Sequence, residues 1–171
     1  SQLRKLDKII KMRQENAKYI SSRLSKFTDL KTPNSPQNYE HIYQMYTITL
    51  PNKQVRDQLQ FFLESKGIMS KVYFNPVHLK TLYKRNYGFK EGDLPLTEEL
   101  SGRVLTLPMS VTLNEEDLRY ISSSIKEFFN KGDEWMAISN DLLAHKDRKI
   151  KKVVSCLNES LSELNKRKGE N

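Results

Sequence analysis

Apolar residues recur at steps of three and four along the first 27 positions of the chain. Lysine and arginine fill many of the intervening positions, and Arg13 interrupts the apolar series once. A period near 3.6 residues is typical of a helix with one buried face, so the pattern predicts a long amphipathic helix over residues 3–27. No capping residue precedes it, and we therefore expect that chain lying upstream has been removed. The apolar positions are Leu3, Leu6, Ile10, Ala17, Ile20, Leu24 and Phe27.

Three runs further along the chain have the composition of strands. They are rich in β-branched and aromatic residues, and prolines or glycines stand beside them. The segment between the long helix and the first of these runs, residues 31–38, holds two prolines and no apolar residue, which predicts a loop. The predicted strands are residues 42–50, 68–74 and 104–107.

Helical periods lie between and after these runs. They predict helices over residues 54–66 and 115–129, and Gly67 and Asn114 supply an end and a cap for them. A shorter helix is expected to open at Thr97. Helices that alternate with short strands predict an α/β (α+β) fold, in which a small, mainly antiparallel sheet is covered by helices.

The last forty positions differ in kind from the rest. Residues 132–171 contain no strand pattern, and their apolar residues follow two helical periods that start at Trp135 and at Ile150. We expect a boundary near Lys131, with one domain over residues 1–131 and a helical extension over residues 132–171.

The composition is that of an ordinary water-soluble domain, but the net charge of +8 raises the question of nucleic acid. The basic excess is terminal: residues 1–27 hold eight Lys and Arg against two acids, whereas residues 28–144 hold thirteen against fifteen. Basic ends with no aromatic stacking platform are typical of solvated helix faces, so we expect no specific nucleic-acid partner.

Cysteine and histidine are too sparse for several kinds of site. Cys156 is the single cysteine, so the chain forms no internal disulfide, and the three histidines His41, His78 and His145 lie far apart with no ligand spacing. We expect no metal. No apolar run approaches the length of a membrane span, and the first ten residues lack a signal-peptide core. We therefore expect a cytoplasmic protein with no membrane partner.

One histidine stands in a richer setting, the stretch KVYFNPVHLKTLYKRNYGF at residues 71–89. His78 follows a predicted strand and Asn75-Pro76, among tyrosines and basic residues. A histidine on a loop anchored by a strand is well placed to bind a ligand. The alternative is that its ring only hydrogen-bonds a backbone carbonyl after Pro76.

Ordered features surround this stretch. The helix opens with Gln2-Leu3 and Leu6-Asp7, and a Gly-Ile turn leads into the second strand. The features that follow are an aromatic pair, a Pro-x-His-Leu motif, a downstream tyrosine, an acidic glycine turn, a Leu-Pro strand end and an acidic helix start. In order they are Gly67-Ile68, Tyr73-Phe74, Pro76-Val77-His78-Leu79, Tyr83, Glu91-Gly92-Asp93, Leu107-Pro108 and Leu113 to Asp117.

These features span residues 2–130 and together resemble the C-terminal small domain of the DegT-class (DnrJ/EryC/StrS-like) sugar aminotransferases, which are pyridoxal phosphate (PLP) enzymes of fold type I. The resemblance implies amino transfer from an amino-acid donor to a nucleotide-linked keto sugar. It also implies a missing large domain that carries PLP, and a possible homodimer. Since the cofactor's lysine belongs to that large domain, we expect no catalytic or cofactor-binding residue and no PLP in this chain alone, which should be inactive.

The resemblance also implies where substrate would bind. It places His78 beside the sugar, with Tyr73, Phe74 and Tyr83 as aromatic walls and Lys71 as a basic contact. Relatives often carry arginine where Lys71 stands, and a guanidinium binds phosphate or carboxylate differently from an ammonium. The substrate specificity of those relatives therefore cannot be assumed for this chain. A function of another class stays open, in which the chain is a stand-alone binding or regulatory module derived from such a domain.

Overall fold

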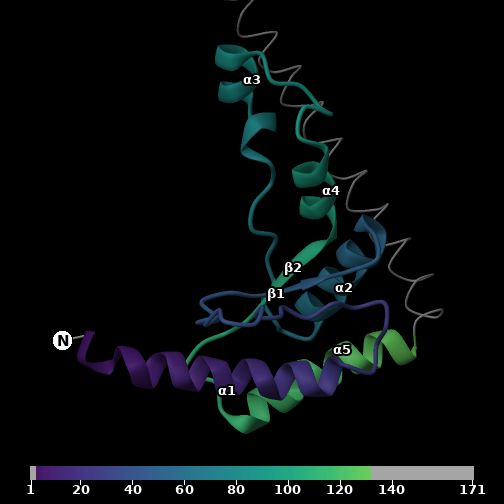
Figure 1. The fold of residues 1–171 in the computed structure, drawn as a ribbon. Coiled ribbons are helices and arrows are strands. Elements are labelled where there is room, and N and C mark those ends of the chain that lie inside the picture. Colours follow the sequence, from purple (N-terminus) through teal and green to yellow (C-terminus); the bar gives the residue numbers. More distant parts are fainter. Residues whose placement is uncertain (1–2, 132–171) are drawn as a thin grey trace, which may run out of the picture. The chain divides into compact units, whose positions relative to one another are not determined.

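Two short strands form the centre of the described part of the chain, residues 3–131, in a computed structural model (Figure 1). Strand β1, Tyr46–Thr49, pairs antiparallel with β2, Val104–Leu107, so that Tyr46 lies opposite Leu107. Single bridges widen the sheet on both sides: Lys31 pairs with Thr49, and Lys71 pairs with Thr106. The predicted α/β fold with an antiparallel sheet is confirmed.

The predicted strands agree unevenly with this sheet. Residues 104–107 are confirmed as β2. The strand predicted over residues 42–50 is only four residues long, because Tyr43 has a positive φ of 47° and interrupts the extended backbone before β1. The strand predicted over residues 68–74 is wrong as a continuous strand: only Lys71 pairs, through the bridge to Thr106.

The three longest helices confirm the predicted helices to within a few residues at each end. A short 3₁₀ turn, Leu3–Lys5, leads into α1, Leu6–Leu24, which ends earlier than predicted. The other two are α2, Lys53–Ser65, and α5, Glu115–Asn130.

Side-chain caps explain why α2 and α5 begin where they do. The Asn52 side-chain oxygen accepts a hydrogen bond from the Val55 N–H at 2.9 Å. At α5 the predicted cap is confirmed as a full capping box: Asn114 Oδ1 accepts from the Asp117 N–H at 2.8 Å, and Asp117 Oδ2 accepts from the Asn114 N–H at 3.0 Å. Each pairing satisfies backbone donors that a helix start leaves open.

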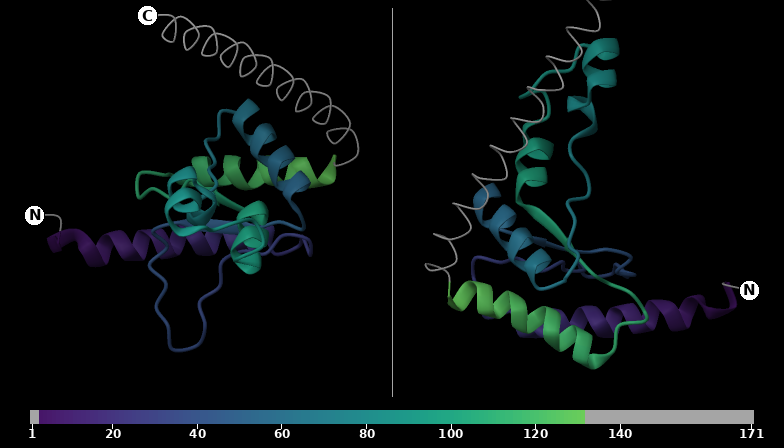
Figure 2. Two further views of the ribbon diagram at one scale, coloured as in Figure 1. Left: turned by 90° about the horizontal axis from the view of Figure 1, so that it is seen from above. Right: turned by 180° about the vertical axis from the view of Figure 1, so that it is seen from behind.

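Helices α1 and α5 lie side by side below the sheet, and α2 packs against α5 and β2 (Figures 1 and 2). Their apolar faces and the inward side chains of the strands form one core. Each fully buried aliphatic side chain contributes about 1.5–3 kcal/mol of transfer free energy, so this core dominates the stability of the domain. Its fully buried members include Ile20, Leu24, Tyr46, Ile48, Leu50, Leu59, Leu63, Leu105 and Ile125.

A long excursion from the sheet, residues 72–103, extends away from this core, and we call it the arm (Figure 1). It contains a 3₁₀ turn η2, Val77–Leu79, and the helices α3, Thr81–Tyr87, and α4, Pro95–Arg103. Helix α4 begins at a proline with Leu94 as its N-cap residue, not at Thr97 as predicted. No residue of α3 or α4 is buried, and the sequence pattern did not predict α3.

Among residues 3–131, Tyr46 is the one core residue whose side chain ends in a titratable hydroxyl. Its OH lies 2.6 Å from Ser21 Oγ, and burial raises the pKa of Tyr46 to about 12. A raised pKa means that the neutral phenol is favoured in the folded state, so this contribution to stability is present below the ordinary tyrosine pKa near 10 and is lost as pH rises through about 12.

We therefore predict that one tyrosine ionises only near pH 12 when the protein is titrated by ultraviolet absorbance, because Tyr46 is held neutral by burial. Tyr46→Phe should remove that late step and leave the earlier ones in place. A titration in which all tyrosines ionise together near pH 10, with the fold intact, would contradict the buried phenol.

The predicted helical extension, residues 132–171, lies outside the described residues, as does the boundary assigned to it. Among residues 3–131 we find no helix with the length and apolar character that a membrane span requires.

Candidate functional site

A small cavity of about 350 Å³ opens beside the sheet where Lys71 joins it. Lys71 is fixed by two backbone hydrogen bonds: its N–H donates to the Thr106 carbonyl at 3.0 Å, and the Thr106 N–H donates back at 2.8 Å. The bridge places Lys71 and Tyr73 together in the wall of the cavity. The rest of the wall comes from Met69, from the segment before β1, and from the end of β2 with the segment that follows it.

The lining of this cavity combines one cation with soft apolar groups. Lys71 is exposed, and within residues 3–131 its ammonium has no ion-pair partner. Met45, Met69 and Met109 line the same cavity, and methionine side chains adapt to flat or irregular apolar ligands. An unpaired ammonium beside an adaptable apolar wall can hold a ligand that carries an anionic group and a ring.

Tyr73 supplies an aromatic surface to this cavity. Its side chain is 41% exposed, and its ring meets Phe74 edge to face with the centroids 5.1 Å apart, across a cis peptide bond. Tyr73 therefore gives the cavity a partly open aromatic wall, and Phe74 does not line it.

His78 lies elsewhere, in the arm. It belongs to η2, only 5% of the residue is exposed, and its ring meets Phe89 edge to face with the centroids 5.9 Å apart. His78 Nε2 lies 2.9 Å from Glu98 Oε1, so its partner is a carboxylate and not the backbone carbonyl of the alternative reading. The residue does not line the Lys71 cavity, and its predicted contact with substrate stays a prediction.

Glu98, at the start of α4, is the residue that the sequence reasoning missed. Besides His78, its carboxylate accepts hydrogen bonds from the Gly92 N–H at 2.9 and 3.0 Å and from the Leu94 N–H at 3.2 Å. The hydrogen bond from His78 and then that from Gly92 hold the pKa of Glu98 below its usual range. The carboxylate thus ties η2, the turn after α3 and the first turn of α4 together. The available signal was the acid pair Glu98-Glu99, which follows the predicted helix start at Thr97.

Tyr83 lies on α3, where its ring faces that of Tyr87 with the centroids 5.8 Å apart. It does not line the Lys71 cavity. The structure therefore brings together two of the four predicted substrate contacts, Lys71 and Tyr73 at the base of the arm, and leaves His78 and Tyr83 further along the arm. Among residues 3–131 no cluster of His, Cys, Asp or Glu has the geometry of a metal site.

A family model agrees with this chain over most of the described part. The model of the DegT/DnrJ/EryC1/StrS aminotransferase family matches residues 1–126. The match includes the sheet, the arm and the capping box of α5.

Individual proteins show the same likeness. A pleiotropic regulatory protein of Geobacillus stearothermophilus is 38% identical over 99 residues, which are 57% of this chain and 26% of that protein. A UDP-N-acetyl-3-dehydro-alpha-D-glucosamine 3-aminotransferase of Acidithiobacillus ferrooxidans is 32% identical over 99 residues, which are 57% of this chain and 25% of that protein.

A crystal structure of a DegT DnrJ EryC1 StrS aminotransferase from Brucella abortus superimposes with a TM-score of 0.63 at 32% identity, over 74% of this chain and 32% of that one. The chain thus spans between a quarter and about a third of the length of the proteins that it matches.

Proposed function

Because this chain belongs to the DegT/DnrJ/EryC1/StrS aminotransferase family, we propose that it is the C-terminal small domain of a PLP-dependent nucleotide-sugar aminotransferase. The complete enzyme moves an amino group from an amino acid to a keto sugar in amino-sugar biosynthesis. The relative from Acidithiobacillus ferrooxidans supports this class of reaction, because its name gives amino transfer to a UDP-linked dehydro sugar. That relative is about four times as long as the matched segment, so a large domain completes the enzyme.

None of the lysines among residues 3–131 has the surroundings that an imine with PLP requires. A lysine that forms a stable imine needs a pocket that lowers its pKa, usually by excluding water. No lysine among residues 3–131 is buried. We therefore assign PLP, whose ring takes up the electron pair during amino transfer, to the large domain.

The apolar surface of the arm is the observation that carries this proposal. Helices α3 and α4 bury no residue, yet they and their flanking segments display large apolar side chains. Many exposed apolar side chains on one segment indicate a place that another protein surface covers. We assign the large domain as the cover, since the relatives continue this fold in much longer chains. The exposed apolar residues are Phe74, Val77, Leu82, Tyr87, Leu94, Leu96 and Leu100.

The Lys71 cavity is the proposed contact for the nucleotide-linked sugar. The Lys71 ammonium suits a phosphate oxygen, and the Tyr73 ring with the neighbouring methionines suits the face of a base or sugar. His78 and Tyr83 lie on the arm outside this cavity. Their predicted contact with the sugar requires the arm to form part of the closed active site.

The test uses a chimera in which residues 1–131 replace the matching domain of the Brucella abortus aminotransferase. Lys71→Ala in that chimera should raise the KM for the nucleotide sugar by about tenfold or more, because a charged hydrogen bond to phosphate is lost. The kcat and the imine absorbance of the bound PLP should stay unchanged, since the proposed contact of Lys71 is with the phosphate of the nucleotide sugar and not with the cofactor.

Lys31→Ala is the matched control, because Lys31 is also exposed and also forms a single bridge, at the other edge of the sheet. It should leave the KM unchanged. If the Lys71→Ala chimera and the unsubstituted chimera have the same KM, the cavity beside Lys71 does not bind the substrate.

A regulatory function is the second candidate, favoured by the Geobacillus stearothermophilus protein, which is named as a pleiotropic regulator. In that case a partner other than the large domain covers the arm. The gene sequence upstream of Ser1 separates the two. An in-frame large domain supports the aminotransferase, and a start codon at that point supports the regulatory module.

A further inference from the structure

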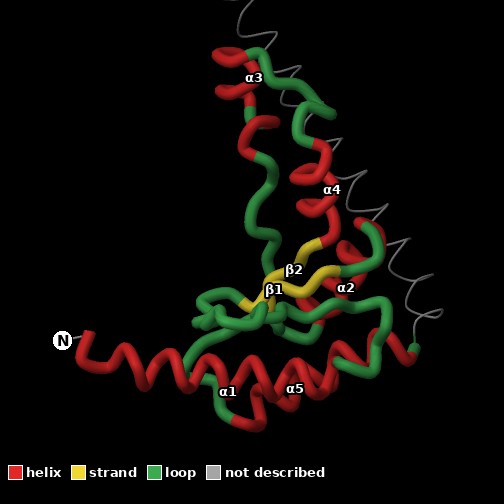
Figure 3. Tube along the Cα trace, in the orientation of Figure 1, coloured by secondary structure: helices red, strands yellow, loops and turns green. Residues whose placement is uncertain are grey.

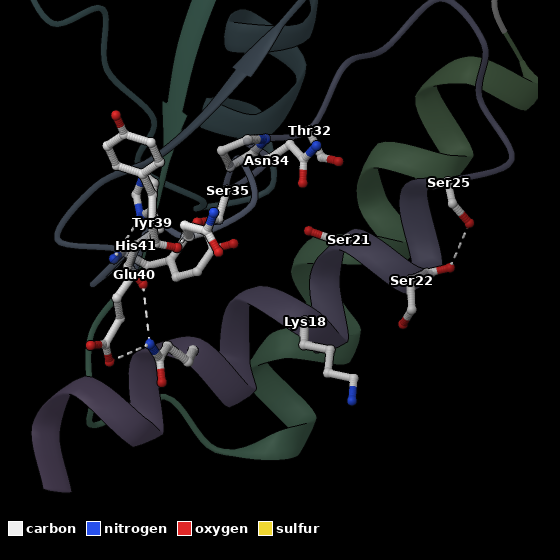
Figure 4. A pocket seen from close by; sticks show the side chains of 14 residues that line it. Lys18, Ser21, Ser22, Ser25, Thr32, Asn34, Ser35, Tyr39, Glu40 and His41 are labelled. Atoms are coloured by element: carbon white, nitrogen blue, oxygen red, sulfur yellow. Dashed lines mark hydrogen bonds between the residues drawn. The ribbon is translucent and has the colours of Figure 1, made fainter. Parts of the chain in front are cut away.

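A second and larger cavity, of about 870 Å³, lies between α1 and the loop that leads to β1 (Figure 4). One wall is a face of α1 that includes Ser21 and Ser22, and the other is the loop over residues 32–43. No residue lines both this cavity and the proposed substrate cavity beside Lys71. The two share only the end of this loop, where Tyr43 lines the larger cavity and Gln44 and Met45 line the smaller one.

The lining of the larger cavity is rich in hydroxyl and amide groups. Serine, threonine, asparagine and glutamine side chains make up much of it, and its two full charges, Lys18 and Glu40, have opposite signs. Groups that both donate and accept, with no net charge, match a ligand that itself carries many hydroxyls. They do not match an apolar ligand or a strongly charged one.

The loop that closes this cavity is long and its backbone is strained. No helix or strand interrupts it between α1 and β1 (Figure 3), and unstructured loops of this length are usually functional. Asn38 and Tyr43 have positive φ values of 71° and 47°. For a tyrosine this conformation is an outlier, and such outliers concentrate at ligand sites, where surrounding contacts offset their cost.

The contacts that hold the strained turn also prepare a donor. The Tyr43 N–H donates to His41 Nδ1 at 2.9 Å, and the two rings lie 4.2 Å apart. Because Nδ1 accepts this bond, the neutral imidazole carries its proton on Nε2, for which residues 3–131 provide no acceptor, so that Nε2 can donate to a ligand. Gln14 on α1 donates to the Glu40 carboxylate at 3.2 Å and to the His41 carbonyl at 3.3 Å, so the carboxylate of the preceding residue is also held in place.

An open aromatic face lies at the same end of the cavity. Tyr39 is 74% exposed, and it lies with Glu40 and His41 above α1 (Figure 4). Within residues 3–131 its ring stacks on no other ring. A free tyrosine face beside paired donors and acceptors suits a sugar ring, whose C–H face is apolar and whose rim carries hydroxyls.

We propose that this cavity binds a neutral mono- or disaccharide at a site separate from that of the transaminase substrate. Tyr39 stacks on the sugar ring, and Glu40 and His41 Nε2 hydrogen-bond its hydroxyls. The site does not depend on the proposed amino transfer, because its residues all belong to α1 and the loop after it.

The test is a titration of the full ¹⁵N-labelled chain with glucose, N-acetylglucosamine, maltose and diacetylchitobiose, followed by amide chemical shifts. UDP and UDP-N-acetylglucosamine distinguish a free saccharide from the sugar of a nucleotide-linked substrate. At least one saccharide should give saturable shifts at Ser35, Tyr39 and His41 in the millimolar range, and UDP should not.

Substitutions separate stacking from a general effect on the fold. Tyr39→Ala should abolish the saturable shifts, and Tyr39→Phe should retain them, because the ring face and not the hydroxyl makes the contact. Tyr87→Ala is the matched control, since Tyr87 is 70% exposed on α3, and it should leave binding unchanged. The proposal is overturned if no saccharide gives saturable shifts, if the shifts lie around Lys71, or if they survive Tyr39→Ala.

Discussion

The 171-residue chain, incubated alone with PLP, an amino-acid donor and a nucleotide-linked keto sugar, is expected to transfer no amino group. The reason lies in its lysines. None among residues 3–131 is buried, so an imine that one of them formed with PLP would be exposed to hydrolysis. The chimera with the Brucella abortus large domain is expected to be active, because that domain brings the missing amine. The measurement is donor-dependent formation of the amino sugar, by mass spectrometry.

The apolar surface of the arm allows a test of whether the arm contacts the large domain. Leu96→Asp in the chimera should abolish most of the activity, because a carboxylate would have to be buried against the large domain without a partner. The same change in the isolated chain should leave Tm unchanged, since Leu96 is 74% exposed there. Ile42→Asp, a change at another exposed apolar residue, serves as the control and should leave the chimera active.

Turnover by the chain alone would contradict this division of labour. If it were abolished by one Lys→Ala change within residues 1–171, the catalytic amine would belong to this chain. Equal activity of the Leu96→Asp and unsubstituted chimeras would mean that the arm does not meet the large domain.

The elements that could be predicted from sequence are those fixed by local signals. Helix α5 carries its cap, its acidic first turn and its apolar period within one stretch, and β2 is a short apolar run next to a proline. The extent of β1 could not be predicted, because it depends on the positive φ of Tyr43, and the composition of residues 42–45 is that of a strand. Helix α3 buries no residue, so it leaves no apolar period to detect.

The candidate site divides in the same way. Lys71 and Tyr73 lie two residues apart on one extended segment, and a period of two places them on the same side of a sheet. The hydrogen bond between His78 and Glu98 joins residues that are twenty positions apart. Neither the local composition nor the apolar periodicity of the sequence could predict it. The motif indicated that His78 matters, but its burial and its carboxylate partner required the fold.

Replacing Glu98 with alanine is expected to loosen the arm while the helices and sheet of the core stay folded. The change removes the acceptor of the Gly92 and Leu94 N–H groups and leaves the buried His78 without its partner. Amide exchange at Gly92 and Leu94 should become faster by about tenfold or more, the factor expected when a hydrogen bond of ordinary strength is lost. Amides of α5 should keep their protection, because α5 packs on α1 and α2.

Glu99→Ala is the matched control, since Glu99 is the next residue and its partner is Arg103, at 2.6 Å on the surface. It should leave the exchange of Gly92 and Leu94 unchanged. Exchange at Gly92 and Leu94 that is equally slow in both variants would show that the contact between His78 and Phe89, and not the carboxylate, holds the arm.

The same carboxylate should make the arm sensitive to acid. Hydrogen bonds from His78 and Gly92 hold the pKa of Glu98 below its usual range, so the ionised form is favoured in the folded arm. Its contribution is fully present above the ordinary glutamate pKa and is lost as pH falls through the lowered one. The opening of the arm, measured by exchange corrected for the intrinsic rate at each pH, should therefore increase in acid. Glu98→Gln, which cannot ionise, should remove that increase, and a pH dependence that survives the substitution would assign the acid response to another group.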